Sequence, residues 1–257
     1  MRIVAMVAAL LLLVAGCGTG PRAQAAAAPA VVTRVIHLAR GTDRPLPTTI
    51  WYEGELAGRH PIVLFSHGLG GLPEQFAPLA ETWAKAGYVV AAPTYPRTNG
   101  RVKVDASDIR RQPADAAYVL KQLAAGDLAA HLDLDRVAAV GFSAGGTTTL
   151  GLFRDGHSPA LRAAVSVSGR RPPTAFAGPG APMLFLHGDE DPVVPISAGR
   201  AAYRAAPWQK EFVVVRGAGH GQFLNPGHPD YPSVSTRILR FLEQHVPVTE
   251  SRAAAGR

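Results

Sequence analysis

The feature that most restricts the fold is a series of short apolar segments that alternate with segments of helical spacing. The apolar segments, which are typical of buried parallel strands, are residues 62–66, 88–92, 137–142, 163–167, 183–186 and 212–215. Helical spacing occurs at residues 76–86 and 106–123, after Ser143, and at residues 198–206 and 233–245. Because alternating strands and helices form a parallel sheet, the pattern predicts an α/β fold with helices on both faces of a mostly parallel central sheet.

The chain before these segments predicts an additional hairpin. Residues 31–38 and 48–53 have the composition of strands, and residues 41–47 between them carry the Gly and Pro of a turn region. The sheet would then have about eight strands, parallel after the hairpin. No internal repeat is visible, and 257 residues are enough for one sizeable core. We therefore expect a single domain over residues 31–257.

The N-terminus has the pattern of an export signal. Arg2 precedes an apolar run over residues 3–15, which is too short for an ordinary membrane-spanning helix. Its end, Leu13-Val14-Ala15-Gly16-Cys17, resembles the lipobox of bacterial lipoproteins, in which a lipid is attached to the cysteine. We therefore expect residues 1–17 to be a lipoprotein-type signal with its lipobox cysteine, residues 18–30 to be a flexible tether, and a lipid on Cys17 to anchor the protein to a membrane.

Two other outcomes remain open for this segment. Cleavage at small residues, for instance within residues 25–28, would release a secreted protein without lipid. An uncleaved signal would instead remain as an anchor. In each case the folded domain is expected outside the cytoplasm.

Charge and cysteine content exclude several classes of protein. The formal charge is +7, but Lys and Arg are scattered, and the densest clusters are the pairs Arg110-Arg111 and Arg170-Arg171. Because no aromatic residues interleave with a basic stripe, we expect no nucleic-acid partner. The single cysteine, Cys17, precedes the folded part, which excludes disulfides, thiolate metal sites and cysteine nucleophiles from the domain.

The sequence Gly141-Phe142-Ser143-Ala144-Gly145 lies where a buried strand is expected to end and a helix to begin. A serine at such a sharp turn projects its hydroxyl above the sheet, and the flanking glycines let strand and helix pass closely. The position at a helix N-terminus also favours developing negative charge. Ser143 is therefore the candidate nucleophile, the alternative being a helix-capping serine in a glycine-rich turn.

A serine nucleophile needs a base and a group that orients the base. His220 lies in a Gly-rich loop after the last predicted strand, which makes it the best candidate base. His228 is the rival, although the prolines on either side of it indicate a peripheral turn. The alternative for His220 is a loop histidine that bonds only to backbone.

The orienting acid is expected between the serine and the histidine, after the penultimate strand. Asp189, Glu190 and Asp191 compete there, and Asp191 is preferred because Pro192 follows it and lets the loop turn back toward the histidine. Asp189 is interpreted as a turn residue that bonds local amides. Asp115 precedes the serine and is interpreted as a helix-face or turn carboxylate.

These motifs, in this order, resemble the α/β-hydrolase superfamily over residues 31–246. The segments Arg44 to Tyr52, Phe65 to Gly71 and Gly141 to Gly146 resemble more narrowly the predicted dienelactone hydrolases, a group close to cutinase-like polyester hydrolases and platelet-activating-factor acetylhydrolases. True dienelactone hydrolases use a cysteine nucleophile, which this domain lacks. The resemblance implies an α/β-hydrolase fold and an oxyanion hole formed by the backbone amides of Ala144 and Leu69. It also implies that His67 orders the Leu69 loop.

The expected active site is open, because residues 168–181 are too few for a helical cap domain. Leu69, Phe142, Val193, Val194, Phe223 and Leu224 are the expected apolar lining, although each could be ordinary core. The leading interpretation is an exported serine hydrolase that cleaves carboxylic esters through an acyl-enzyme intermediate. An acyltransferase, lipase or peptidase on the same fold, or a non-catalytic surface-binding domain, are the alternatives. No cofactor or metal is expected, since H-E-x-x-H is absent.

Overall fold

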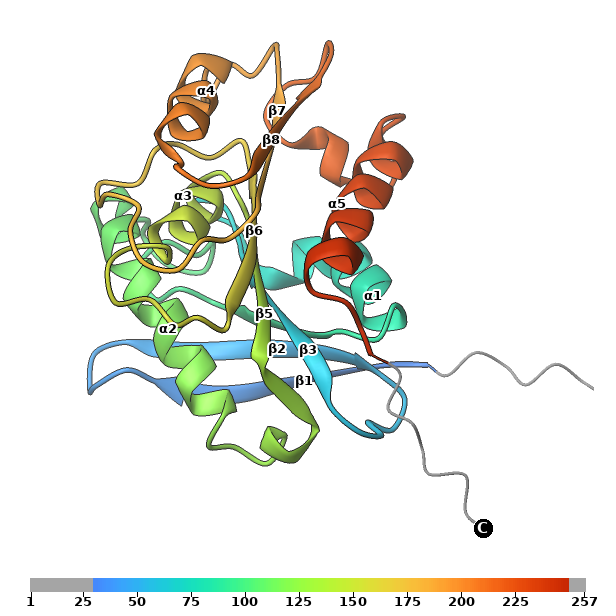
Figure 1. Cartoon of the computed structure of the whole chain (residues 1–257). Helices are drawn as coiled ribbons and strands as arrows, with labels where there is room; N and C mark the ends of the chain where they lie inside the picture. The colour runs from blue at the N-terminus through green and yellow to red at the C-terminus, as the bar shows by residue number, and fades with distance from the viewer. Residues whose placement is uncertain (1–29, 250–257) are drawn as a thin grey trace, which may run out of the picture.

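The computed structural model describes residues 30–249, which form one eight-stranded sheet with helices on both sides (Figure 1). Its strands are β1 (Val31–Ala39), β2 (Pro45–Glu53), β3 (His60–Ser66), β4 (Val89–Pro93), β5 (Leu132–Phe142), β6 (Leu161–Val167), β7 (Met183–Gly188) and β8 (Lys210–Val215). Each predicted strand is present, with ends that differ by a few residues. Their spatial order is β1-β2-β4-β3-β5-β6-β7-β8.

The directions of the strands also confirm the prediction. β1 and β2 form the antiparallel hairpin, with Val35 opposite Thr49, and β2 is antiparallel to β4. All the pairs from β4 to β8 are parallel. Because parallel strands end at the same edge of a sheet, the loops after β3, β5, β7 and β8 gather at one edge.

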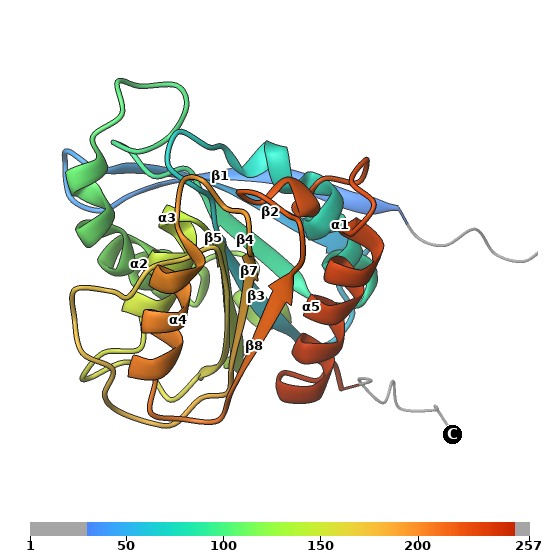
Figure 2. The same ribbon diagram turned by 90° about the horizontal axis from the view of Figure 1, so that it is seen from above.

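Helices cover the two faces unequally. The longer ones are α1 (Ala77–Lys85), α2 (Gln112–Leu123), α3 (Ala144–Gly151), α4 (Ile196–Ala205) and α5 (Tyr231–His245), with short 3-10 turns η1 (Pro73–Phe76), η2 (Ala106–Arg111), η3 (Ala129–His131) and η4 (Gln222–Leu224). Figures 1 and 2 show α1 and α5 on one face and α2, α3 and α4 on the other. The segment predicted as one helix over 106–123 is divided, because Pro113 lacks an N–H group and fits only the first turn of α2.

Two apolar layers enclose the sheet. In β3, Val63 and Phe65 face the layer under α1 and α5, whereas Ile62 and Leu64 face the layer under α2 and α3. This alternation is the two-residue period of a strand that is buried on both faces. The continuous apolar runs of the sequence therefore correspond to strands between two helical layers.

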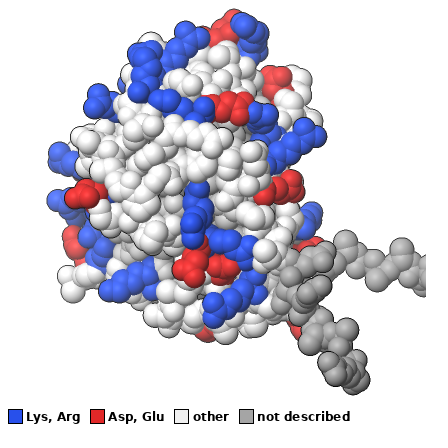
Figure 3. All heavy atoms as spheres, viewed as in Figure 1, with Lys and Arg blue, Asp and Glu red and all other residues white. Residues whose placement is uncertain are grey.

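The connection from β6 to β7, residues 168–182, contains no helix or strand, in agreement with the prediction of no cap domain. Within residues 30–249, no helix is both long and apolar enough to cross a membrane. The predicted signal with Cys17, nearly all of the predicted tether, and residues 250–257 lie outside the described residues. On the face seen in Figure 3, Lys and Arg are spread among Asp and Glu.

Candidate active site

Ser143 occupies the turn between β5 and α3 in a conformation that is rare for a residue with a side chain. Its φ is 55° and its ψ is −115°, and its amide donates a hydrogen bond to the carbonyl oxygen of Val167 at 2.8 Å. A non-glycine residue with positive φ persists only where surrounding structure holds it there. This strained turn after a central strand is the geometry of a nucleophile elbow.

The glycines on either side of Ser143 are required by close backbone contacts. A Cβ atom on Gly145 would lie 1.9 Å from the carbonyl oxygen of Ser66 at the end of β3. A Cβ atom on Gly141 would lie 2.2 Å from the carbonyl oxygen of Gly145. Side chains at these positions would therefore push α3 away from the strands that support it.

The structure brings together the three residues that the sequence analysis selected. The Ser143 hydroxyl lies 2.9 Å from His220 Nε2, and His220 Nδ1 lies 2.7 Å from Asp191 Oδ2. His220 follows β8 and Asp191 follows β7, so both reach the elbow from the same edge of the sheet. With the ring proton on Nδ1, His220 donates to the Asp191 carboxylate and its Nε2 accepts from the Ser143 hydroxyl.

The Asp191 carboxylate is buried, but both of its oxygens have hydrogen-bond partners. Its Oδ1 accepts hydrogen bonds from the amides of Val193 at 2.9 Å and Val194 at 2.8 Å. Burial alone would raise the pKa of Asp191, but the hydrogen bonds from His220 and from these two amides lower it below its ordinary value. Asp191 is therefore ionised at neutral pH.

His187, which lies near the end of β7, supports the Asp191 loop. Its Nε2 donates to the carbonyl oxygen of Val194 at 2.8 Å and lies 3.5 Å from Asp191 Oδ2. Burial lowers the pKa of His187, so its ring stays neutral and stacks against Phe212. The position directly before Gly188 and Asp189 was the only sequence signal for this role.

The interpretation of Asp189 as a residue that bonds local amides is wrong. Its Oδ1 accepts a hydrogen bond at 2.6 Å from the amide of Gly217, 28 residues away in the loop that carries His220. Parallel strands β7 and β8 are neighbours in the sheet, and the loops that follow them therefore meet. The sequence around Asp189 does not indicate this hydrogen bond to Gly217.

One expected oxyanion-hole residue directly follows Ser143, and the other comes after Gly68, where an added Cβ atom would lie 3.5 Å from Ser143 Cβ. Ala144 is the first residue of α3, and Leu69 is 44% exposed in the loop after β3. The amide of Gly70, next to Leu69, donates to the carbonyl oxygen of Thr98 at 2.7 Å, which ties this loop to residues 94–105.

His67 is buried, and among residues 30–249 its ring bonds only to backbone groups. Its Nδ1 donates to the carbonyl oxygen of Gly68 at 2.7 Å, and its Nε2 accepts from the amide of Tyr95 at 3.2 Å. Burial lowers the pKa of His67, so the neutral ring that this bonding requires is also the favoured form.

The structure distributes the expected apolar lining unevenly. Val193 is 57% exposed beside Asp191, and the ring of Phe142 packs against His220 with centroids 4.9 Å apart. The prediction that Phe223 lines the active site is wrong, because Phe223 is completely buried in the layer under α5. Val194 and Leu224 are also buried. Loop residues with an apolar side chain were expected to face the substrate, but these three complete the core.

A cavity of about 750 Å³ opens elsewhere, between α2 and residues 154–158. Leu134 and Val137 line it from the first half of β5, whereas Ser143 follows the last residue of that strand. None of the six expected apolar lining residues contributes to it. This cavity is therefore separate from the Ser143 site.

His228, the rival candidate for the base, contacts Asp230, two residues away in the sequence. His228 Nδ1 accepts from the amide of Asp230 at 3.2 Å and lies 3.6 Å from the carboxylate of that residue. No group of three or more His, Cys, Asp or Glu residues within residues 30–249 is arranged to hold a metal ion.

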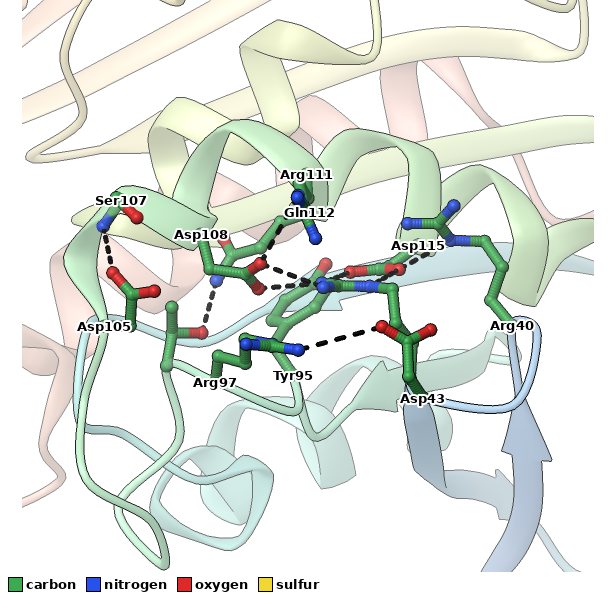
Figure 4. Close-up of polar contacts among 12 residues, drawn as sticks. Arg40, Asp43, Tyr95, Arg97, Asp105, Ser107, Asp108, Arg111, Gln112 and Asp115 are labelled. Carbon is green, nitrogen blue, oxygen red and sulfur yellow. Dashed lines mark hydrogen bonds and ion pairs between the residues drawn. The ribbon is translucent and has the colours of Figure 1, made fainter.

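A buried arginine cluster, which the sequence analysis missed, joins the residue before β2 to η2 and α2. Arg44 donates to both carboxylate oxygens of Asp108 at 2.9 and 2.7 Å, and to Asp115 Oδ1 at 2.8 Å. Arg40 also donates to Asp115 at 2.7 Å, and Figure 4 shows it approaching from the side opposite Asp108. Asp115 is completely buried, so it lies on the inward face of α2 rather than on a solvated face.

The eight-stranded sheet and the elbow at the end of β5 define an α/β-hydrolase. A family model described as the dienelactone hydrolase family matches residues 49–243, and the chain belongs to that family. It is similar to a Yersinia pestis protein named "Putative carboxymethylenebutenolidase", with 28% identity over 240 residues that cover 80% of this chain and 87% of that protein. The family is one of hydrolases that act on ester-type substrates.

Proposed function

We propose that this protein is a serine hydrolase that cleaves carboxylic esters through an acyl-enzyme intermediate. The observation that carries the proposal is the continuous hydrogen-bonded chain from Ser143 through His220 to Asp191. A serine hydroxyl is a weak nucleophile at neutral pH, and this arrangement places a base within reach of its proton.

In the proposed reaction, Ser143 Oγ attacks the ester carbonyl carbon while His220 Nε2 takes the hydroxyl proton. Asp191 holds the ring through Nδ1 and stabilises the imidazolium that forms. His220 then gives the proton to the departing alcohol, which leaves an acyl group on Ser143. Water then attacks this acyl group while His220 takes its proton. The bond from the acyl carbon to Ser143 Oγ breaks, His220 returns the proton to Ser143 Oγ, and the carboxylic acid is released.

The tetrahedral oxyanion needs fixed donors where its charge develops. We assign this role to the backbone amides of Ala144 and Leu69, each of which can contribute about 3 kcal/mol of barrier reduction. The first turn of α3 adds the positive end of its dipole at the same place. Both donors belong to backbone that is held by hydrogen bonds or by helix geometry.

The substrate proposal follows from the openness of the site. Residues 168–182 form no cap, and Leu69 and Val193 are exposed near the elbow. This surface suits bulky or surface-held esters, with Phe142 and Val193 contacting the substrate. The predicted export signal and Cys17 support an enzyme that works outside the cytoplasm, on a lipid anchor or as a secreted form.

The direct test is a p-nitrophenyl ester panel of graded acyl length combined with a fluorophosphonate probe. The full chain should hydrolyse at least one ester and gain one phosphonyl group on the peptide that contains Ser143, as shown by mass spectrometry. The Ser143→Ala variant should lose both properties. Wild-type turnover in a clean Ser143→Ala preparation would contradict a serine mechanism.

A further inference from the structure

The side-chain amide of Gln112 connects the two parts of the chain that carry the proposed oxyanion-hole donors. Gln112 begins α2 and is completely buried. Its Nε2 donates to the hydroxyl of Thr98 at 2.6 Å, and its Oε1 accepts from the hydroxyl of Thr148. Thr98 and Thr148 are also completely buried.

Each threonine contacts either the residue that carries one donor or the residue next to it. The carbonyl oxygen of Thr98 accepts the amide of Gly70, the residue after Leu69. Thr148 lies one turn after Ala144 in α3, and its hydroxyl is 3.0 Å from the carbonyl oxygen of Ala144. A single buried amide thus links the Leu69 loop to the helix that begins with Ala144.

Gln112 lies in the sequence between the two carboxylates of the buried arginine cluster. Asp108 and Asp115 lie four residues before it and three residues after it, so all three share one face of the chain around the start of α2. Both carboxylates bind the guanidinium of Arg44, which comes from the region before β2. Figure 4 shows the Gln112 side chain beside Asp108, within this group of polar contacts.

We propose that Gln112 is a positioning residue that sets the separation of the Leu69 and Ala144 amides. This inference rests on the proposed function. Two donors from different loops stabilise an oxyanion only if their spacing is held closely, because a displacement of about 1 Å can cost about 100-fold in rate. A buried amide that is hydrogen-bonded through both its nitrogen and its oxygen provides that rigidity.

The variant Gln112→Leu removes both hydrogen bonds with little change in volume. We expect kcat to fall by about 10- to 100-fold with KM nearly unchanged, because the loss concerns the transition state. The inhibition constant of a boronic acid that forms a tetrahedral adduct on Ser143 should rise by a similar factor. Gln122→Leu, on the same helix, is the matched control and should change neither quantity.

Variants of the threonines separate positioning from a general loss of structure. Thr98→Val and Thr148→Val should each lower kcat and boronate affinity, whereas Thr98→Ser and Thr148→Ser should retain them. In the Gln112→Leu background, the valine changes should add little, since the bridge is already broken. If Gln112→Leu does not fold, the kcat and boronate affinity of the threonine variants test the proposal instead.

The two proposals fail differently. Wild-type protein without Ser143-dependent ester turnover would overturn the proposed function together with the role of Gln112. Active wild-type protein, with kcat and boronate affinity unchanged in folded Gln112→Leu or in both valine variants, would overturn the role of Gln112 alone.

Discussion

Asp189 accepts a hydrogen bond from the backbone amide of Gly217 at 2.6 Å, and this bond joins the loop of the proposed acid to the loop of the proposed base. Asp191 lies two residues after Asp189, and His220 lies three residues after Gly217. The contact between Asp191 and His220 is therefore supported by a second contact between the same two loops.

This relationship predicts different effects for two changes at Asp189. Asp189→Asn keeps an acceptor oxygen and should lower kcat less than threefold. Asp189→Ala removes the acceptor and should lower kcat by about 10-fold, which corresponds to about 1.4 kcal/mol. Steady-state kinetics on one soluble ester compares them. A larger loss from Asp189→Asn than from Asp191→Asn would reverse the assignment of the acid.

Replacing the proposed acid should have a much larger kinetic effect. Asp191→Asn keeps the size of the side chain but removes the charge that holds His220 in its tautomer, so kcat should fall by about 10⁴-fold. Stopped assays over hours and a thermal melt would measure the residual rate and confirm folding. A loss below about 10-fold in a folded variant would contradict the role of Asp191.

The buried arginine cluster should contribute far more to stability than a surface ion pair. Arg44→Met leaves Asp108 and Asp115 short of their main partner and should cost about 3–5 kcal/mol in the free energy of unfolding. Arg34 and Asp127 form a bidentate pair, but their side chains are 31% and 72% exposed. Arg34→Met should cost less than about 1 kcal/mol. Urea denaturation of both variants tests the comparison, and equal costs would contradict it.

His157 should contribute to a loss of stability in acid. Neither of its ring nitrogens has a hydrogen-bond partner within residues 30–249, and the ring packs against Phe153 and Trp208. Burial lowers its pKa below 6.5. The unfolded chain therefore binds a proton at this residue at a higher pH than the folded chain does, and stability falls as the pH drops through 6.5.

His157→Phe should remove that contribution. It keeps an aromatic ring and eliminates two buried polar atoms, so we expect about 1 kcal/mol of added stability at pH 7. The melting temperature should also fall less between pH 7.5 and pH 5.5 than in the wild type. Buried His67 and His187, whose pKa values are also lowered, keep part of the dependence. An unchanged pH dependence would show that His157 titrates alike in both states.

Cys17 decides between a lipid-anchored and a secreted protein. If the lipobox is used, intact-mass spectrometry of the native product should show an N-terminal cysteine that carries lipid. Cys17→Ala should abolish this modification and lower retention in the membrane fraction. A mature N-terminus beyond residue 17 without lipid would establish the secreted form.

The sequence by itself determined the strands of the sheet and the position of the elbow. Both depend on local patterns, since an apolar run such as residues 137–142 must be buried and glycines such as Gly141 and Gly145 must accompany a sharp turn. The choice of Asp191 and His220 also came from the sequence, because strand order places the ends of parallel strands at one edge.

Only the tertiary structure decided which distant side chains meet. The bond from Asp189 to Gly217 spans 28 residues, and the bond from Arg44 to Asp115 spans 71. Sequence periodicity indicates which face of its own element a residue occupies, but not which residue of another element packs against it. The same reason explains the wrong prediction for Phe223. Its position in a loop suggested contact with substrate, whereas packing against α5 places it in the core.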